Sequence, residues 1–185
     1  DIISGIGFFN VSGNIFSANG ANLNIDKSIG VMMGQGVNWD IDDKNPHQKT
    51  LASLAPATFQ YRFQDGSNGT TGITIDPANY DLNGVDTAVP ANRYTVQRIY
   101  SFTSNNVKIQ KGQIIYNTLK DAKAALTSDP FVTEPSIAAN GLLRGFLILK
   151  VGTTDLTNSD DALFVEAGKF GQSTGSGGGG TTDAE

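Results

Sequence analysis

Hydrophobic and polar residues alternate with a period of two along the clearest segments of this chain, a pattern that predicts β-strands. Phe59, Tyr61 and Phe63 alternate with polar neighbours in "FQYRFQ". The run "DGSNG" that follows is rich in turn formers. Ile73 and Ile75 then resume the alternation. We therefore expect a β-hairpin within residues 56–77.

A second pair of strands is expected in "RYTVQRIYSFTSNNVKIQ". Asn105 and Asn106 divide this segment, and asparagine tolerates the positive φ of a tight turn. Further short strands are expected at "QIIY" (113–116) and in "ALFVEAGKFG" near the end of the chain. One face of the strand before the turn is expected to carry Tyr94, Val96, Arg98, Tyr100 and Phe102.

One segment, at about 117–127, shows helical signals. Asn117 or Thr118 is placed to cap it, and Thr118 and Asp121 have the spacing of a capping box. Asp129-Pro130 is expected to end the helix. Its apolar stripe consists of Leu119, Ala122 and Leu126.

The segment "GLLRGFLILKVG" (141–152) is almost continuously apolar. Such a run is typical of a strand that is covered on both faces, either by a helix or by a neighbouring subunit. A chain of this size has limited means to cover both faces, so the segment favours an oligomer. Residues 1–58, in contrast, are rich in Gly and Asn and predict only short strands, and 79–92 reads as a loop.

The predicted fold class is therefore mainly β, similar to a β-sandwich or barrel, with one short helix docked on a sheet. We expect a β-rich region at 1–88 and a region of strands plus helix at 89–170. Residues 171–185 form a Gly/Ser-rich C-terminal extension. A glycine-rich extension buries little surface by itself.

Composition narrows the classes of function. The net charge of the 185-residue chain is −5, which argues against nucleic-acid binding. The chain has no cysteine, so disulfides, thiol catalysis and cysteine metal sites are excluded. No apolar run reaches the length of about 18 residues that spans a bilayer, so membrane insertion is not expected.

An acidic run in "WDIDDKNPH" supplies a weak candidate for a metal site, with Asp40, Asp42 and Asp43 as ligands. Hard cations need several converging oxygens. The run lacks the glycine of a calcium-binding EF-hand loop, so a solvated loop and a Ca²⁺ site both remain open. The only histidine, His47, is expected to be a surface loop residue.

No catalytic motif is recognisable. The acids offer no selected pair for glycoside hydrolysis, no nucleophile elbow exists, and no glycine-rich loop matches a phosphate cradle. We therefore expect no enzyme and no cofactor. Exposed aromatic rings stack well on sugars, and Trp39 and Tyr80 are the aromatics in the most polar, loop-like surroundings.

Several motifs follow one another in an order that resembles tail-fibre and tail-associated virion proteins of bacteriophages. They are "RYTVQRIY" (93–100), "QIIYNTLKDA" (113–122), "TTDLT" (153–157) and "AGKFG" (167–171), before the glycine-rich extension. The first half of the chain resembles the region that precedes these motifs in such proteins. The resemblance covers most of the chain and includes no catalytic residue.

This resemblance implies a structural or host-recognition component of the virion tail. It implies a homotrimer that contacts other tail proteins and binds a host cell-surface glycan. Around a threefold axis the glycine extension would lie between subunits, where side chains would clash. Two alternatives stay open: a secreted carbohydrate-binding or adhesin module that works as a monomer, and a depolymerising tailspike with two acids in a groove.

Overall fold

The computed structural model describes residues 7–168, and it confirms a mainly β chain with 41% strand and 7% helix. Its strands form several separate sheets, none of which closes into a barrel. The glycine-rich extension, 171–185, lies outside the described residues.

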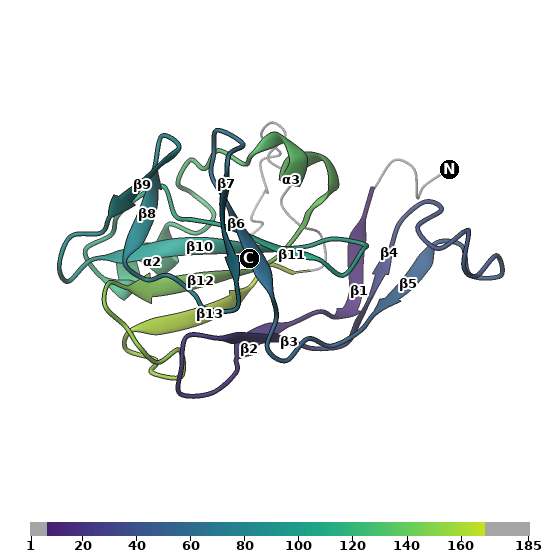
Figure 1. The fold of residues 1–185 in the computed structure, drawn as a ribbon, viewed down its shortest axis with the longest axis horizontal. Coiled ribbons are helices and arrows are strands. Elements are labelled where there is room, and N and C mark those ends of the chain that lie inside the picture. Colours follow the sequence, from purple (N-terminus) through teal and green to yellow (C-terminus); the bar gives the residue numbers. More distant parts are fainter. Residues whose placement is uncertain (1–6, 169–185) are drawn as a thin grey trace, which may run out of the picture.

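A six-stranded sheet forms the body of the molecule, with the strand order β13-β12-β10-β11-β6-β7 (Figure 1). Every neighbouring pair in it is antiparallel except β11 and β6, which are parallel. The strands are β6 (Phe59–Arg62), β7 (Asn68–Gly72), β10 (Tyr94–Ser101), β11 (Val107–Gln110), β12 (Leu142–Lys150) and β13 (Ala162–Glu166). The expected hairpin is confirmed as β6–β7, but its second strand begins at Asn68 and ends before Ile73 and Ile75, so their expected place in that strand was wrong. The pair divided at Asn105 is confirmed as β10–β11.

This sheet extends across the expected boundary at residue 88. β6 and β7 belong to the first expected region, whereas β10 to β13 belong to the second. The parallel pairing of Phe59 with Val107, continuing to Arg62 with Gln110, joins the two. The six-stranded sheet therefore contains strands from both expected regions.

β12 is buried along its length except at its last residue, Lys150. From Phe146 on, its side chains alternate between two cores. Phe146 and Ile148 pack with α2 residues, whereas Leu147 and Leu149 pack with Phe16 and Ile25 on the other side. The expectation of a strand covered on both faces is confirmed, and the chain itself supplies the cover on each side. The continuous apolar run gives no support to an oligomer.

Helix α2 (Leu119–Ala124) confirms the capping prediction, because the Thr118 side chain accepts a hydrogen bond from the backbone N–H of Asp121. The described residues contain a second short helix, α3 (Pro135–Asn140), so the prediction of a single helix was wrong. Its N-cap is Glu134, whose carboxylate accepts from the N–H groups of Ser136 and Ile137. A glutamate is not among the usual capping residues.

Two further local expectations were wrong. The segment "QIIY" forms only an isolated bridge between Tyr116 and Tyr94, on the edge of β10 that pairs with β11 farther along the strand. The expected loop 79–92 contains a hairpin of β8 (Asn79–Leu82) and β9 (Val85–Ala88). Asn83 and Gly84 turn it with φ angles of 53° and 87°, the geometry that Asn-Gly favours.

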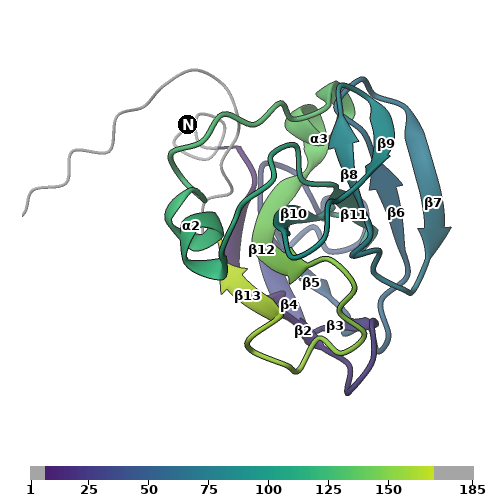
Figure 2. The same cartoon turned by 90° about the vertical axis from the view of Figure 1, so that its left-hand side faces the viewer.

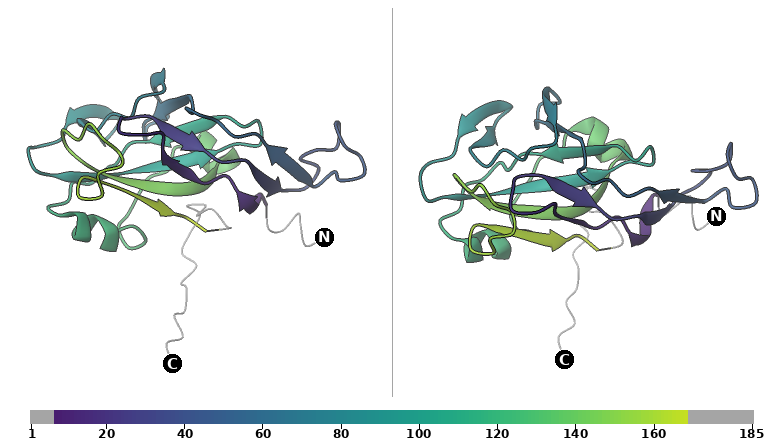
Figure 3. Two further views of the ribbon diagram at one scale, coloured as in Figure 1. Left: turned by 90° about the horizontal axis from the view of Figure 1, so that it is seen from below. Right: turned by 60° about the horizontal axis from the view of Figure 1, so that its bottom comes forward.

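The N-terminal residues form two smaller sheets. β2 (Phe16–Ala18) pairs with β3 (Ile25–Lys27) beneath the body. β1 (Phe9–Gly13), β4 (Gly30–Met33) and β5 (Gln48–Leu51) form a three-stranded sheet. Figures 1 and 3 show this sheet and the β4–β5 connection projecting from the body as an arm.

Candidate functional site

The two aromatic residues expected to contact sugar are not brought together. Trp39 lies in the β4–β5 connection at the tip of the arm, with 62% of its surface exposed, and Ile41 beside it is 77% exposed. Tyr80 is half-buried on β8. The β8–β9 hairpin and the tip of the arm stand at opposite ends of the molecule in Figure 1. These residues therefore do not form one binding platform.

The acidic run on the arm is organised as a turn. The carboxylate of Asp42 accepts hydrogen bonds from the backbone N–H groups of Lys44 and Asn45 and from the Asn45 side chain. The hydrogen bond from Asn45 is the main cause that lowers the pKa of Asp42. Within residues 7–168, no three acidic or histidine side chains are grouped as metal ligands would be. We therefore propose no cation site at Asp40, Asp42 and Asp43.

His47 closes the same loop. Its backbone carbonyl accepts from the N–H of Gly34, and its Nδ1 accepts from the N–H of Gly36 at 3.1 Å. The half-buried imidazole therefore contributes to the shape of the arm.

The chemically richest site is a hollow above Lys111, a residue that sequence reasoning missed. Lys111 follows β11 and is almost fully buried. Its ammonium contacts the carboxylates of Asp76 at 2.5 Å and Asp86 at 2.7 Å. The two acids come from different segments, the β7–β8 connection and β9. A single buried cation therefore holds two partly exposed carboxylates at one place.

Aromatic rings form the floor of this hollow. The Lys111 ammonium lies 5.0 Å from the ring centre of Tyr61 and 5.9 Å from that of Phe63. Cation–π attraction at such distances helps to hold a buried ammonium. Tyr61 lies on β6 and Phe63 directly follows it, and both rings are buried as the alternating pattern predicted.

A buried network fixes the Tyr61 hydroxyl and Asp76. The hydroxyl donates to Oε1 of Gln97 at 3.0 Å and accepts from the N–H of Asp76 at 2.8 Å. Gln97 in turn donates to the Asp76 carbonyl at 2.7 Å. Burial is the main cause that raises the pKa of Tyr61, so its hydroxyl stays protonated and can make this donation.

The wall of the hollow is formed by β7, through Asn68, Gly69 and Thr70. A Cβ at Gly69 would lie 2.8 Å from the Cβ of Tyr61, which is too close for any side chain. The glycine therefore lets β7 approach the floor. The cavity has a volume of about 380 Å³ and opens to solvent. In Figure 2 the β8–β9 hairpin stands beside β6 and β7 at this side of the molecule.

The electrostatics of the hollow favour hydrogen bonding over proton transfer. Burial raises the pKa of Asp76, but hydrogen bonds from Lys111 and Asn79 outweigh it, and the net shift is downward. Asp76 is therefore an ionised acceptor. A carboxylic acid that protonates a glycosidic oxygen instead needs a raised pKa. The hollow presents two carboxylates, an amide and a hydroxyl beside aromatic carbon, a set that matches the polar and apolar faces of a carbohydrate.

No protein-family model, curated protein or solved structure matches this chain. Within the described residues, no helix has the length and apolar character needed to cross a lipid bilayer.

Proposed function

We propose that this chain is a non-enzymatic adhesive component of a bacteriophage tail, a fibre or fibre-like virion protein that binds a cell-surface glycan in the hollow above Lys111. The ordered motifs from "RYTVQRIY" to "AGKFG" support the class of protein. The composition of the hollow supports the ligand, and this is the observation that carries the proposal. The homotrimer, the contacts with other tail proteins and the location in the virion rest on the sequence resemblance.

The position of the hollow agrees with this role. It opens to solvent between the β6–β7 hairpin, at one edge of the six-stranded sheet, and the β8–β9 hairpin, so a ligand on another surface can reach it. Each hollow offers few contacts, so the affinity of one site for a sugar would be weak. Three copies on one fibre would raise the overall avidity through the effective concentration of the second and third sites.

A depolymerising activity is the less favoured alternative. The hollow has two acids, but both are paired to the Lys111 ammonium. The net downward shift of the pKa of Asp76 is the opposite of what a general acid requires. Loss of viscosity of a bacterial polysaccharide on incubation with the protein would support this alternative instead.

A secreted carbohydrate-binding module is favoured by one specific observation. The aromatic floor and the polar acceptors of the hollow lie together within one chain, as a module that works as a monomer requires. Light scattering distinguishes the two proposals, because a module of this kind would be monomeric at micromolar concentration, whereas a fibre component would be trimeric.

The ligand is tested with a pair of matched variants on β7. Thr70 lines the hollow, and its neighbour Thr71 lines a different surface depression beside Gln60 and Lys108. Both threonines are exposed, so a tryptophan at either position is accommodated in solvent. Thr70→Trp should block the hollow and abolish binding to the glycans that the natural chain retains on an array. Thr71→Trp should leave that binding intact.

Two results would contradict the glycan site. One is that the natural chain binds no glycan on an array of bacterial surface polysaccharides. The other is that Thr70→Trp and Thr71→Trp bind equally well.

A further inference from the structure

Asp86, on β9, is the carboxylate of the Lys111 hollow that has the most free capacity for a ligand. Its Oδ1 accepts from the Lys111 ammonium at 2.7 Å, and within residues 7–168 its Oδ2 accepts from no donor. The side chain is 46% exposed. A carboxylate has about four acceptor positions, so most of those on Asp86 are open to solvent or to a ligand.

The neighbouring acids are used by the chain itself. The carboxylate of Asp76 accepts three hydrogen bonds, one of them from Lys111. The carboxylate of Asp81, which pairs with Asp86 in the β8–β9 hairpin, also accepts three and is fully buried. Asp86 is therefore the acid that offers a free oxygen to the hollow.

Negative charge exceeds positive charge at this place. The cation that contacts Asp76 and Asp86 is Lys111, and only 3% of its side chain is exposed. No ion pair in the described part of the chain includes Asp81. The open rim thus presents carboxylate oxygen, whereas the balancing ammonium is covered. A cationic group of a ligand is attracted to such a rim, and a carboxylate, sulfate or phosphate is repelled.

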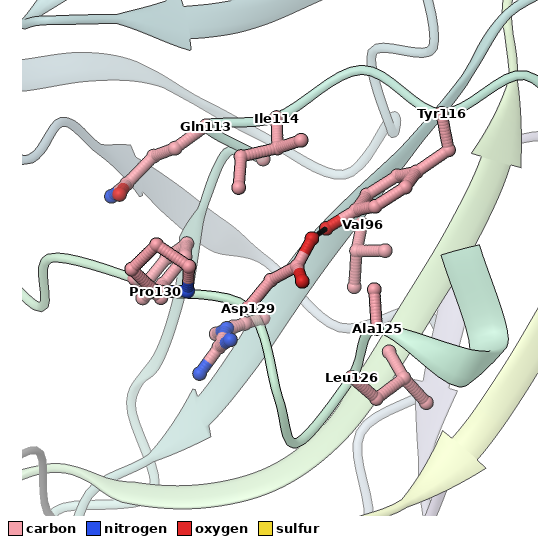
Figure 4. Close-up of a pocket in the computed structure, with 11 residues that line it drawn as sticks. Val96, Gln113, Ile114, Tyr116, Ala125, Leu126, Asp129 and Pro130 are labelled. Carbon is pink, nitrogen blue, oxygen red and sulfur yellow. Dashed lines mark hydrogen bonds between the residues drawn. The ribbon is translucent and has the colours of Figure 1, made fainter. Parts of the chain in front are cut away.

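Two other cavities lack this combination. A depression of about 300 Å³ beside Gln60 and Thr71 is lined by Lys108, and none of the described residues around it is acidic. The pocket in Figure 4, where Tyr116 donates to Asp129, has a free volume of about 20 Å³, which holds roughly one water molecule. The Lys111 hollow, at about 380 Å³, has room for a sugar ring.

We propose that the glycan bound in the Lys111 hollow carries free amino groups, as a de-N-acetylated hexosamine polymer does, and that a sugar ammonium pairs with Asp86. This inference rests on the glycan site proposed above and names the class of its ligand. An ammonium donates charge-assisted hydrogen bonds, which are roughly twice as strong as neutral ones. The sugar hydroxyls then face Thr70 on the wall, and the apolar face of the ring faces the aromatic floor.

Two oligosaccharides of equal length test the role of the amine. One consists of glucosamine and the other of N-acetylglucosamine. Each is titrated into the full chain in a calorimeter at about pH 5.5, where sugar amines are protonated and carboxyls with a pKa of about 4 are ionised. The glucosamine oligomer should bind about tenfold more tightly, and added sodium chloride should weaken its binding more than that of the acetylated oligomer. Equal or tighter binding of the acetylated oligomer would overturn the inference.

Matched variants test whether the preference originates at Asp86. Asp86→Asn keeps an oxygen that can accept from Lys111, and the two oligomers should then bind about equally. Asp43→Asn removes the same charge at the arm, at the opposite end of the molecule in Figure 1, and should keep the preference. A preference that survives in Asp86→Asn would contradict the assignment. The comparison of the two oligomers on the natural chain depends on neither variant.

Two further results separate this inference from the glycan site itself. If the natural chain binds another glycan that Thr70→Trp blocks, but shows no preference for the amine, the glycan site stands and the amino sugar does not. If Thr70→Trp leaves the binding of the glucosamine oligomer intact, that oligomer binds outside the hollow and the inference is overturned.

A last comparison tests whether the ligand is a sugar. A lysine oligopeptide carries ammonium groups without a sugar ring or hydroxyls, so it should bind more weakly than the glucosamine oligomer. Equal or tighter binding of the peptide, blocked by Thr70→Trp, would overturn the assignment to an amino sugar and indicate a basic protein segment instead.

Discussion

The hydroxyl of Tyr61 on β6 donates a hydrogen bond to the side chain of Gln97 on β10 across the intervening strand β11. Both side chains are at most 2% exposed. The same hydroxyl accepts from the N–H of Asp76, so one oxygen joins the sheet to the segment that carries a wall of the Lys111 hollow. The shape of the candidate site is thus coupled to the packing of the body.

Tyr61→Phe should destabilise the chain by about 1–3 kcal/mol, because the Gln97 oxygen and the Asp76 N–H would then be buried without partners. Urea unfolding measures this. Tyr80→Phe is the matched control, since the Tyr80 hydroxyl has no hydrogen bond among residues 7–168. Equal stability of the two variants would show that the buried network contributes nothing.

The acid sensitivity of the chain should depend on Glu134, which caps α3 and pairs with Arg62. Burial raises the pKa of this carboxyl, but hydrogen bonds from Ser136 and Arg62 outweigh it and lower the pKa overall. A carboxyl whose pKa is lowered by folding stabilises the folded state above its unfolded pKa of about 4.3. That contribution is lost as the pH falls through the folded-state pKa.

Glu134→Gln should therefore reduce the free energy of unfolding by about 1–3 kcal/mol at pH 7, because Arg62 then loses its buried, charged partner. It should also flatten the decline in stability below about pH 4.3. Denaturant unfolding between neutral and acid pH checks both effects. Glu166→Gln, at an exposed carboxyl on β13, is the control, and an equal flattening in that variant would refute the assignment.

Lys27 on β3 should give the chain a rise in stability at alkaline pH. Its buried ammonium donates to Asn14 and to the carbonyl of Ser28, and burial lowers its pKa to about 8. In the unfolded chain the pKa is about 10.4, so between these values the unfolded state binds more protons than the folded state. Stability therefore rises with pH through this window.

The rise should be visible in thermal unfolding from about pH 8 to about pH 9, below the pKa of about 10 at which tyrosines ionise. Lys27→Met removes the titrating group and should leave a flatter profile over the same range. Lys44→Met, on the exposed β4–β5 connection, should keep the rise. A natural chain whose stability is constant or falls between these pH values would contradict the prediction.

The sequence predicted the parts of this fold that local physics determines. The alternation around Tyr61 gave the β6–β7 hairpin, and the Thr118 capping signal gave α2. Helix α3 was missed because it has only six residues and begins at a glutamate. The β8–β9 hairpin carried a usable signal, since Asn83-Gly84 between apolar residues is a strong hairpin pattern.

No sequence pattern predicts the Lys111 site. Its two acids lie 35 and 25 residues before the lysine and share no motif with it. They meet only because β6 pairs with β11 and the β8–β9 hairpin packs beside them. The burial of Arg98 is likewise set by tertiary packing, since its strand pattern predicted only that it lies on the face with Val96 and Tyr100.

The last prediction concerns how copies of the chain assemble. The arm exposes Trp39 and Ile41 at its tip, and a proposed trimer would bury apolar surface of this kind. Light scattering of the natural chain should give three times the 19.5 kDa mass of one chain.

The double variant Trp39→Ser with Ile41→Ser should already dissociate at concentrations about tenfold or more above those at which the natural chain dissociates. Each large apolar side chain contributes roughly 1.5–3 kcal/mol when buried. Val132→Ser, at a 55% exposed apolar residue of the body, should leave the mass unchanged. A natural chain that is monomeric would refute the trimer, and a double variant that keeps the trimer would place the subunit contact elsewhere.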